Sequence, residues 1–195
     1  MKRILFISLI LLFGTTIFAQ PTFDLGIKAG INNSKLSLNK SDYNSESIVK
    51  AHIGAFGRIG WSRLYLQPEI YFSAKGGDIS SNPSNPIKTA TAFNYNNVDV
   101  PMLLGFKVIK GKVVDVHVIA GPVFSFITKS EIDNETLFDP DYYKNHYVGV
   151  QYGLGADILF FTIDARMEHG NTLYDHPALE GKNSTFMITV GFKIL

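Results

Sequence analysis

The sequence predicts an all-β fold: a closed, eight-stranded, antiparallel up-and-down β-barrel that crosses a membrane and follows a cleavable signal peptide. Three observations lead to this fold class. The chain starts with a segment typical of exported proteins. The remainder divides into eight segments of alternating apolar and polar residues, and the connections between these segments are alternately short and long.

The export segment occupies the first residues of the chain. Lys2 and Arg3 precede an almost unbroken apolar run over residues 4–13, and Ala19 offers a small residue at a cleavage site. This order of features is typical of a secretory signal, and the apolar run is too short to span a bilayer comfortably. We therefore expect a signal peptide over residues 1–19 and a barrel domain over residues 20–195, exported through the periplasm to a bacterial outer membrane.

The composition excludes several classes of protein. The chain contains no cysteine, so it has no disulfide, thiolate metal site or lipidated cysteine. Its 18 Lys and Arg and 17 Asp and Glu leave it almost neutral, which gives no reason to expect nucleic acid as a partner. No apolar run after residue 20 could form a transmembrane helix, so a membrane location requires a barrel.

The eight segments alternate with the period of two that β-strands show. In residues 161–168, one face is apolar and the other carries Thr162, Asp164, Arg166 and Glu168. The full set of predicted strands is 23–32, 52–59, 64–73, 98–108, 114–126, 148–158, 161–168 and 186–194. Pro68, Pro101 and Pro122 fall inside three of them, and we expect β-bulges at these prolines.

The connections alternate in length. Those at 60–62, 110–112 and 158–161 are tight, whereas those at 33–49, 76–92, 128–145 and 170–183 are long and rich in Asn, Ser, Asp, Lys and Pro. Short turns at one end and long loops at the other are typical of outer-membrane barrels. With an even number of strands, both termini would lie at the periplasmic end and the four long loops would face outside.

The polar face of the strands is the one expected to line the lumen. It is rich in glycine, and an eight-stranded barrel needs small residues inside it. It also carries both signs of charge, which could pair within a narrow lumen. The predicted structural charge network consists of Lys28, Arg58, Glu69, Asp99, Lys107, Asp115, Asp157, Asp164, Arg166, Glu168 and Lys193. The alternative is a soluble, periplasmic, lipocalin-like barrel with the faces reversed and a lipid or other apolar ligand inside.

Four stretches of the chain, at residues 26–32, 64–71, 98–104 and 120–124, resemble the PorT-like outer-membrane β-barrel proteins of Bacteroidetes. They keep their order and, with residues 149–157 and 191–193, cover nearly the whole mature chain. The resemblance implies an integral outer-membrane barrel with no shared enzymatic activity, and it accounts for the prolines within the strands.

Candidate chemistry is sparse. Asp164, Arg166, Glu168 and His169, with His176 nearby, form the best acid–base constellation, but no nucleophile or metal motif accompanies it. An acidic loop, with Glu131, Asp133, Glu135, Asp139 and Asp141, lacks the pattern of an EF-hand and is expected to be solvated. His52 and His117 are expected to pair inside the lumen rather than bind zinc. We therefore predict no catalytic, metal or cofactor site.

The expected function is that of a non-enzymatic barrel that anchors four long surface loops for binding or interaction. Its predicted partners are the lipids of the outer membrane and, during biogenesis, the barrel assembly machinery. A porin-like channel is not expected, because side chains fill the lumen of a barrel with eight strands.

Overall fold

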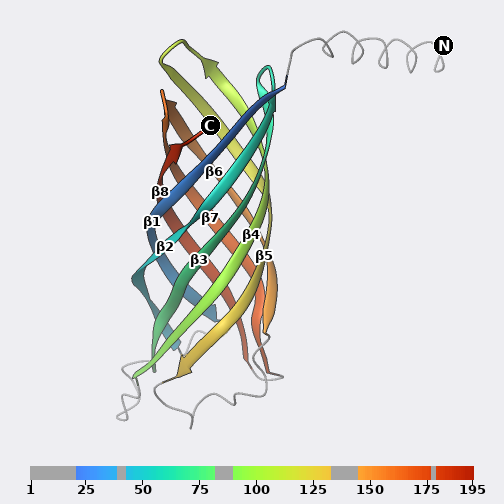
Figure 1. Ribbon diagram of the computed structural model, residues 1–195. Helices are drawn as coiled ribbons and strands as arrows, with labels where there is room; N and C mark the ends of the chain where they lie inside the picture. The colour runs from blue at the N-terminus through green and yellow to red at the C-terminus, as the bar shows by residue number, and fades with distance from the viewer. Residues whose placement is uncertain (1–20, 39–42, 82–89, 133–144, 177–178) are drawn as a thin grey trace, which may run out of the picture.

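The computed structural model describes residues 21–38, 43–81, 90–132, 145–176 and 179–195 (Figure 1). The predicted signal peptide over residues 1–19 lies outside the described residues. The described residues form eight β-strands: β1 (Thr22–Leu38), β2 (Tyr43–Trp61), β3 (Leu64–Ser81), β4 (Ala90–Lys110), β5 (Val114–Ile132), β6 (His146–Ile158), β7 (Phe161–His176) and β8 (Leu179–Lys193). No helix in these parts of the chain is long and apolar enough to cross a membrane.

The strands form one closed antiparallel barrel in sequence order. Each strand pairs with the next, and β8 closes the barrel by pairing with β1, with Ile27 opposite Phe192. The start of β1 and the end of β8 lie at the end of the barrel that carries the short turns (Figure 1). The prediction of a closed, eight-stranded, up-and-down barrel is confirmed.

Tight turns join strands at this end. Ser62, between β2 and β3, and Leu159, between β6 and β7, have φ angles of 60° and 54°. A positive φ in a two-residue turn matches the right-handed twist of the strands that it joins. In both turns the backbone reverses direction within two residues, at 62–63 and at 159–160.

The strands are longer than predicted at the opposite end. They contain 13 to 21 residues, although 9 to 11 tilted residues are enough to cross a bilayer. Much of the predicted long loops at 33–49, 76–92, 128–145 and 170–183 is therefore strand, and these boundaries were wrong. Hydropathy alternates only where lipid covers one face, whereas the backbone ladder continues beyond it, as in the pair Asn33 and Val49.

The prolines do not produce bulges. Pairing between β3 and β2 stops at Glu69 and resumes at Leu66, around Pro68, but the register is the same on both sides. Pro101 lies at a similar gap between β3 and β4, and Pro122 at one between β4 and β5. Proline removes one ladder hydrogen bond yet adds no residue, so the strand remains in register. The predicted bulges at these positions were wrong.

One register shift occurs between β2 and β3, over the interval from Ser47 to His52. The hydroxyl of Ser34 on β1 compensates for part of the lost pairing. It donates to the carbonyl oxygen of Gly76 and accepts from the Gly76 amide, both at 2.9 Å. The Ser34 side chain on β1 thus provides hydrogen-bond partners for backbone groups of β3 that do not pair with β2 at the register shift.

The two faces of the barrel differ sharply in chemistry. Large apolar side chains cover the outside; Leu154, for example, is 61% exposed. Charged side chains point inward, and Arg166 is only 1% exposed. The apolar side chains of the interior include a small cluster of Tyr65, Leu103 and Ile119. This arrangement excludes the lipocalin-like alternative, which requires an apolar interior.

Glycine allows large side chains to fit within the narrow lumen. Tyr65 on β3 lies against Gly105 on β4, where an added Cβ would be 2.0 Å from the tyrosine ring. At Gly121 on β5, a Cβ would lie 2.1 Å from the carbonyl oxygen of Met102. The second contact involves backbone and cannot be relieved by rotation of a side chain.

We expect Gly121→Val to lower the free energy of unfolding by about 1–3 kcal/mol, because the new side chain overpacks the wall of the lumen. The measurement is urea unfolding of the barrel in lipid vesicles, followed by the fluorescence of the single tryptophan, Trp61. Ala120→Val, on the exposed outer face, is the matched control and should change stability by less than about 0.5 kcal/mol. Equal effects of the two substitutions would contradict this account of the lumen.

Candidate functional site

The lumen contains a balanced set of ion-paired charges. The cations are Lys28, Arg58, Lys75, Arg166 and Lys193, and the anions are Glu69, Asp99, Asp157, Asp164 and Glu168. Every strand except β5 contributes at least one of these side chains. The alternation of the strands directs them inward, where burial makes each charge depend on its partners.

One cluster is centred on Glu69. Its carboxylate accepts hydrogen bonds from Lys28, from Nη1 of Arg166 at 2.9 and 3.0 Å, and from Nε2 of Gln67 at 2.6 Å. Nη2 of Arg166 donates to Asp164 at 2.6 Å. One carboxylate thus joins β1 and β7 to β3 across the lumen.

A second cluster surrounds Asp157, nearer the short turns. Nη1 of Arg58 lies 2.5 Å from its carboxylate and Nζ of Lys193 lies 3.1 Å from it. Nε of Arg58 donates to Oε1 of Gln67 at 2.7 Å, and the guanidinium lies 4.3 Å from the centre of the Tyr65 ring. Because Gln67 also bonds Glu69, it connects the two clusters.

A third cluster, nearer the opposite end, is centred on Lys75. Its Nζ lies 3.0 Å from Asp99 and 2.5 Å from Glu168, and it donates to the hydroxyl of Tyr147 at 2.9 Å. Glu168 also accepts from Nε2 of Gln151 at 2.8 Å. Each ionised group in this cluster therefore has several polar partners, as a buried charge requires.

The predicted charge network falls into two parts. Nine of its residues lie in the three clusters, whereas Lys107 and Asp115 pair with each other at 2.6 Å beside the β4–β5 turn. These two side chains are 17% and 16% exposed. The prediction missed Lys75 because its strand was ended at residue 73. The inward positions Tyr71 and Ser73 continue to Lys75, so extending the period of two would have found it.

The two buried histidines have separate partners. The ring nitrogens of His52 lie 2.6 Å from Asn32 and 2.9 Å from Thr189, while Nε2 of His117 lies 2.9 Å from Asp164. The expected pairing of His52 with His117 was therefore wrong. Both histidines face inward, but they lie in different parts of the network.

The weak acid–base constellation is divided between the two faces. Asp164, Arg166 and Glu168 point into the lumen, whereas His169 is exposed on the outer wall. The side chain of His176 and those of the acidic loop around residues 131–141 lie outside the described part. Among the side chains that are described, no group of three or more His, Asp or Glu could hold a metal ion.

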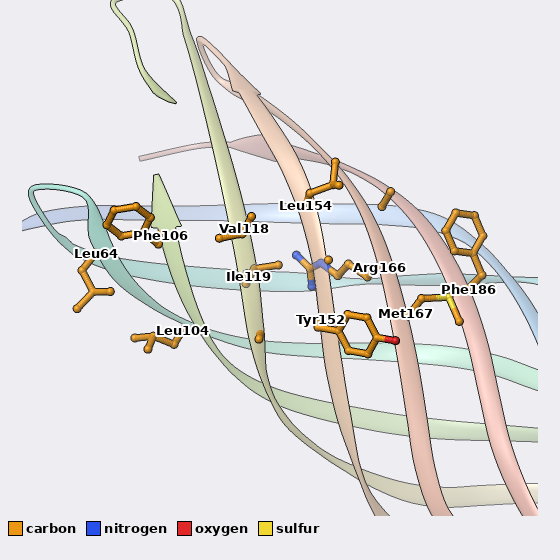
Figure 2. Close-up of a pocket in the computed structure, with 13 residues that line it drawn as sticks. Leu64, Leu104, Phe106, Val118, Ile119, Tyr152, Leu154, Arg166, Met167 and Phe186 are labelled. Atoms are coloured by element: carbon orange, nitrogen blue, oxygen red, sulfur yellow. The ribbon is translucent and has the colours of Figure 1, made fainter. Parts of the chain in front are cut away.

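The outer wall carries an apolar groove of about 620 Å³ over strands β3 to β8. Small residues, Ala120 and Ala165, lie between larger neighbours and leave the wall hollow. Figure 2 shows Leu64, Leu104 and Phe106 toward one end of the groove and Tyr152, Met167 and Phe186 toward the other. Most of these side chains lie on the exposed apolar face of the barrel.

A closed barrel with an apolar outer band and a charged lumen is the architecture of outer-membrane proteins. Residues 18–170 match the family model described as outer membrane protein beta-barrel domain. The chain belongs to this family. As an outer membrane beta-barrel domain protein, it is located in the bacterial outer membrane.

The chain is similar to several solved outer-membrane proteins at low sequence identity. OprG from Pseudomonas aeruginosa is 9% identical with a TM-score of 0.55, and the match covers 90% of this chain and 98% of that one. Neisserial surface protein A is 9% identical with a TM-score of 0.49, covering 87% and 97%. Ail from Yersinia pestis is 13% identical with a TM-score of 0.46, covering 88% and 99%. Among curated proteins, none matches the chain in sequence.

We expect Glu69→Gln to lower the free energy of unfolding by about 3–5 kcal/mol, because it leaves Lys28 and Arg166 with an uncompensated buried charge. Urea unfolding in lipid vesicles measures this loss. The matched control is Asp115→Asn, which breaks the more exposed pair with Lys107 and should cost no more than about 1 kcal/mol. A Glu69→Gln barrel as stable as the control would show that the cluster does not stabilise the fold.

Proposed function

We propose that this outer-membrane barrel is a non-enzymatic scaffold, closed along its axis, that holds its strand ends and their connecting segments at the cell surface for binding or interaction. The observation that carries the proposal is the lumen itself, which is filled by mutually paired charged side chains. The bound ligand or protein would contact the segments that join the strands at the end opposite the termini.

The size of the buried side chains supports a closed lumen. Arg58, Arg166, Lys75, Tyr65 and Tyr71 are among the largest fully buried side chains. Eight strands enclose an interior just wide enough for side chains, so groups of this size leave no continuous aqueous path. A scaffold role therefore agrees with the interior better than a porin-like role does.

The environment of the titratable groups supports a non-enzymatic role. His117 and Asp164 form the pair most similar to a catalytic acid–base couple, but both are buried and Asp164 is also bonded to Arg166. A general base must reach the proton that it abstracts in a bound substrate. The hydrogen bonds of Asp164 instead go to His117 and Arg166.

The proposed orientation places the short turns in the periplasm and the longer strand ends outside, as in other outer-membrane barrels. Membrane lipids would cover the apolar band, and the barrel assembly machinery would insert the chain. Within the family, the stretches at 26–32, 64–71, 98–104 and 120–124 favour membership of the PorT-like proteins of Bacteroidetes. The periplasmic location of both termini also fits entry of the chain from that side.

A pair of cysteine variants tests the orientation, because the natural chain has no cysteine. Lys129 and Lys112 are exposed near opposite ends of β5. We expect a membrane-impermeant maleimide to label Lys129→Cys on intact cells and to label Lys112→Cys only after the outer membrane is permeabilised. The reverse pattern would overturn the orientation, and the unmodified chain serves as the control for background labelling.

We expect the purified barrel to produce no steady single-channel current in planar lipid bilayers, because the charge network fills its axis. A mobility shift on boiling, seen by gel electrophoresis of the same sample, establishes that the tested protein is folded. A stable conductance from such a sample, absent when the boiled protein is added instead, would contradict the closed scaffold.

A further inference from the structure

The apolar groove on the outer wall ends at a group of polar and basic side chains. Met167 and Phe186 line the groove on β7 and β8. The next outward residues along these strands are His169 and Ser184, which lie opposite each other. Lys35 on β1 lies opposite Ser184 from the other side. The groove therefore leads directly to this cluster.

A second lysine extends the cluster along β8. Lys182 is two residues beyond Ser184, and both Lys182 and Lys35 are exposed. Because Lys35 lies opposite Ser184, Lys35 and Lys182 are diagonal neighbours on one face of the β1–β8 pair. Such neighbours lie about 7–8 Å apart. Neither lysine forms an ion pair with another described residue. The flexible lysine stems allow both ammonium groups to approach the same ligand.

The histidine beside these lysines is held in a defined position. Its ring stacks on Tyr152, with centroids 5.7 Å apart and an interplanar angle of 28°. Nε2 of His169 lies 3.1 Å from the Tyr152 hydroxyl, and Nδ1 lies 3.5 Å from Oγ of Ser184. Since Tyr152 also lines the groove, one side chain contacts both the apolar and the polar part of the site.

The first charged side chains beyond the groove are basic. Of the described carboxylates, Glu69, Asp99, Asp157, Asp164 and Glu168 point into the lumen, and Asp24 and Asp115 lie toward the short turns. Farther from the groove, Asp175 on β7 and Glu180 on β8 lie opposite each other. The field of the two lysines, which lie nearer the groove than these residues, favours an anion that approaches from the membrane side.

We propose that the groove and the cluster of Lys35, Lys182, His169 and Ser184 form a binding site for a membrane lipid with a phosphate headgroup. The acyl chain occupies the hollow over Ala120 and Ala165, where it makes dispersion contacts with the surrounding apolar side chains. The two lysines and the polar groups of His169 and Ser184 receive the phosphate oxygens.

The continuity of the two parts favours a lipid over a free phosphate ion. A lipid places its headgroup where the apolar layer ends, and here the basic cluster follows directly after the apolar groove. This site goes beyond the proposed scaffold function. In the proposed orientation it faces the outer leaflet, but binding to purified protein does not depend on that orientation.

The test incorporates the barrel into vesicles of equal parts dimyristoyl phosphatidic acid and dimyristoyl phosphatidylcholine, which share acyl chains and differ in headgroup. After extraction in mild detergent, native mass spectrometry counts the lipids that remain bound. We expect wild-type barrel to retain phosphatidic acid preferentially. Each of Lys35→Gln and Lys182→Gln should lower the retained ratio of phosphatidic acid to phosphatidylcholine about five-fold.

A groove variant tests the acyl part separately. Ala165→Phe fills the hollow and should reduce retention of both lipids while leaving their ratio unchanged. Matched controls are Lys112→Gln, an exposed lysine beside a short turn, and Val49→Phe, an outward position on β2. Both should behave as wild type, and a mobility shift on boiling establishes that every variant is folded.

Three outcomes would overturn the proposal. The preference for phosphatidic acid could survive replacement of both lysines, or Ala165→Phe could leave retention unchanged. The third is complete displacement of the retained lipid by glycerol 3-phosphate, which would indicate an anion site that makes no use of the groove. None of these results bears on the labelling or conductance experiments, so failure of this proposal is distinguishable from failure of the scaffold function.

Discussion

The structure depends on one constraint: within a membrane, every backbone amide and carbonyl must find its hydrogen-bond partner inside the protein. Eight antiparallel strands meet this requirement by closing β8 onto β1, which leaves no unpaired strand edge in the sheet. Closure with this number of strands also fixes a narrow lumen. The need for glycine beside Tyr65, and for partners around each inward charge, follows from that width.

The charges add contacts that a β-ladder cannot provide. Ladder hydrogen bonds join only adjacent strands, whereas Glu69 on β3 bonds Arg166 on β7, and Lys75 on β3 pairs with Glu168 on β7. These contacts cross the lumen and link opposite walls. The outer face has no equivalent connections, because its apolar side chains extend toward lipid. The inner face of each strand thus makes the barrel rigid, and the outer face of the same strand provides its affinity for the membrane.

Much of the fold could be predicted from the sequence, because lipid on one side and a polar lumen on the other impose a period of two on hydropathy. That pattern identified the strands and the inward residues. It could not locate the outer strand ends, since it stops where lipid stops, as the continuation of β1 to Leu38 demonstrates. The hydropathy pattern also could not predict which of the inward charged side chains form ion pairs with each other. The partner of Glu69 is set by the stagger of strands around the barrel, a property of the closed structure and not of any local segment.

The cross-lumen ion pairs have a consequence for the order of folding. Arg58 on β2 and Lys75 on β3 pair with carboxylates on β6 and β7, so these partners come together only when the sheet closes into a barrel. An open sheet in the hydrocarbon layer would present these charges to lipid, at a cost of several kcal/mol for each exposed ion. The cost of exposing these charges therefore favours closure and insertion in one cooperative step.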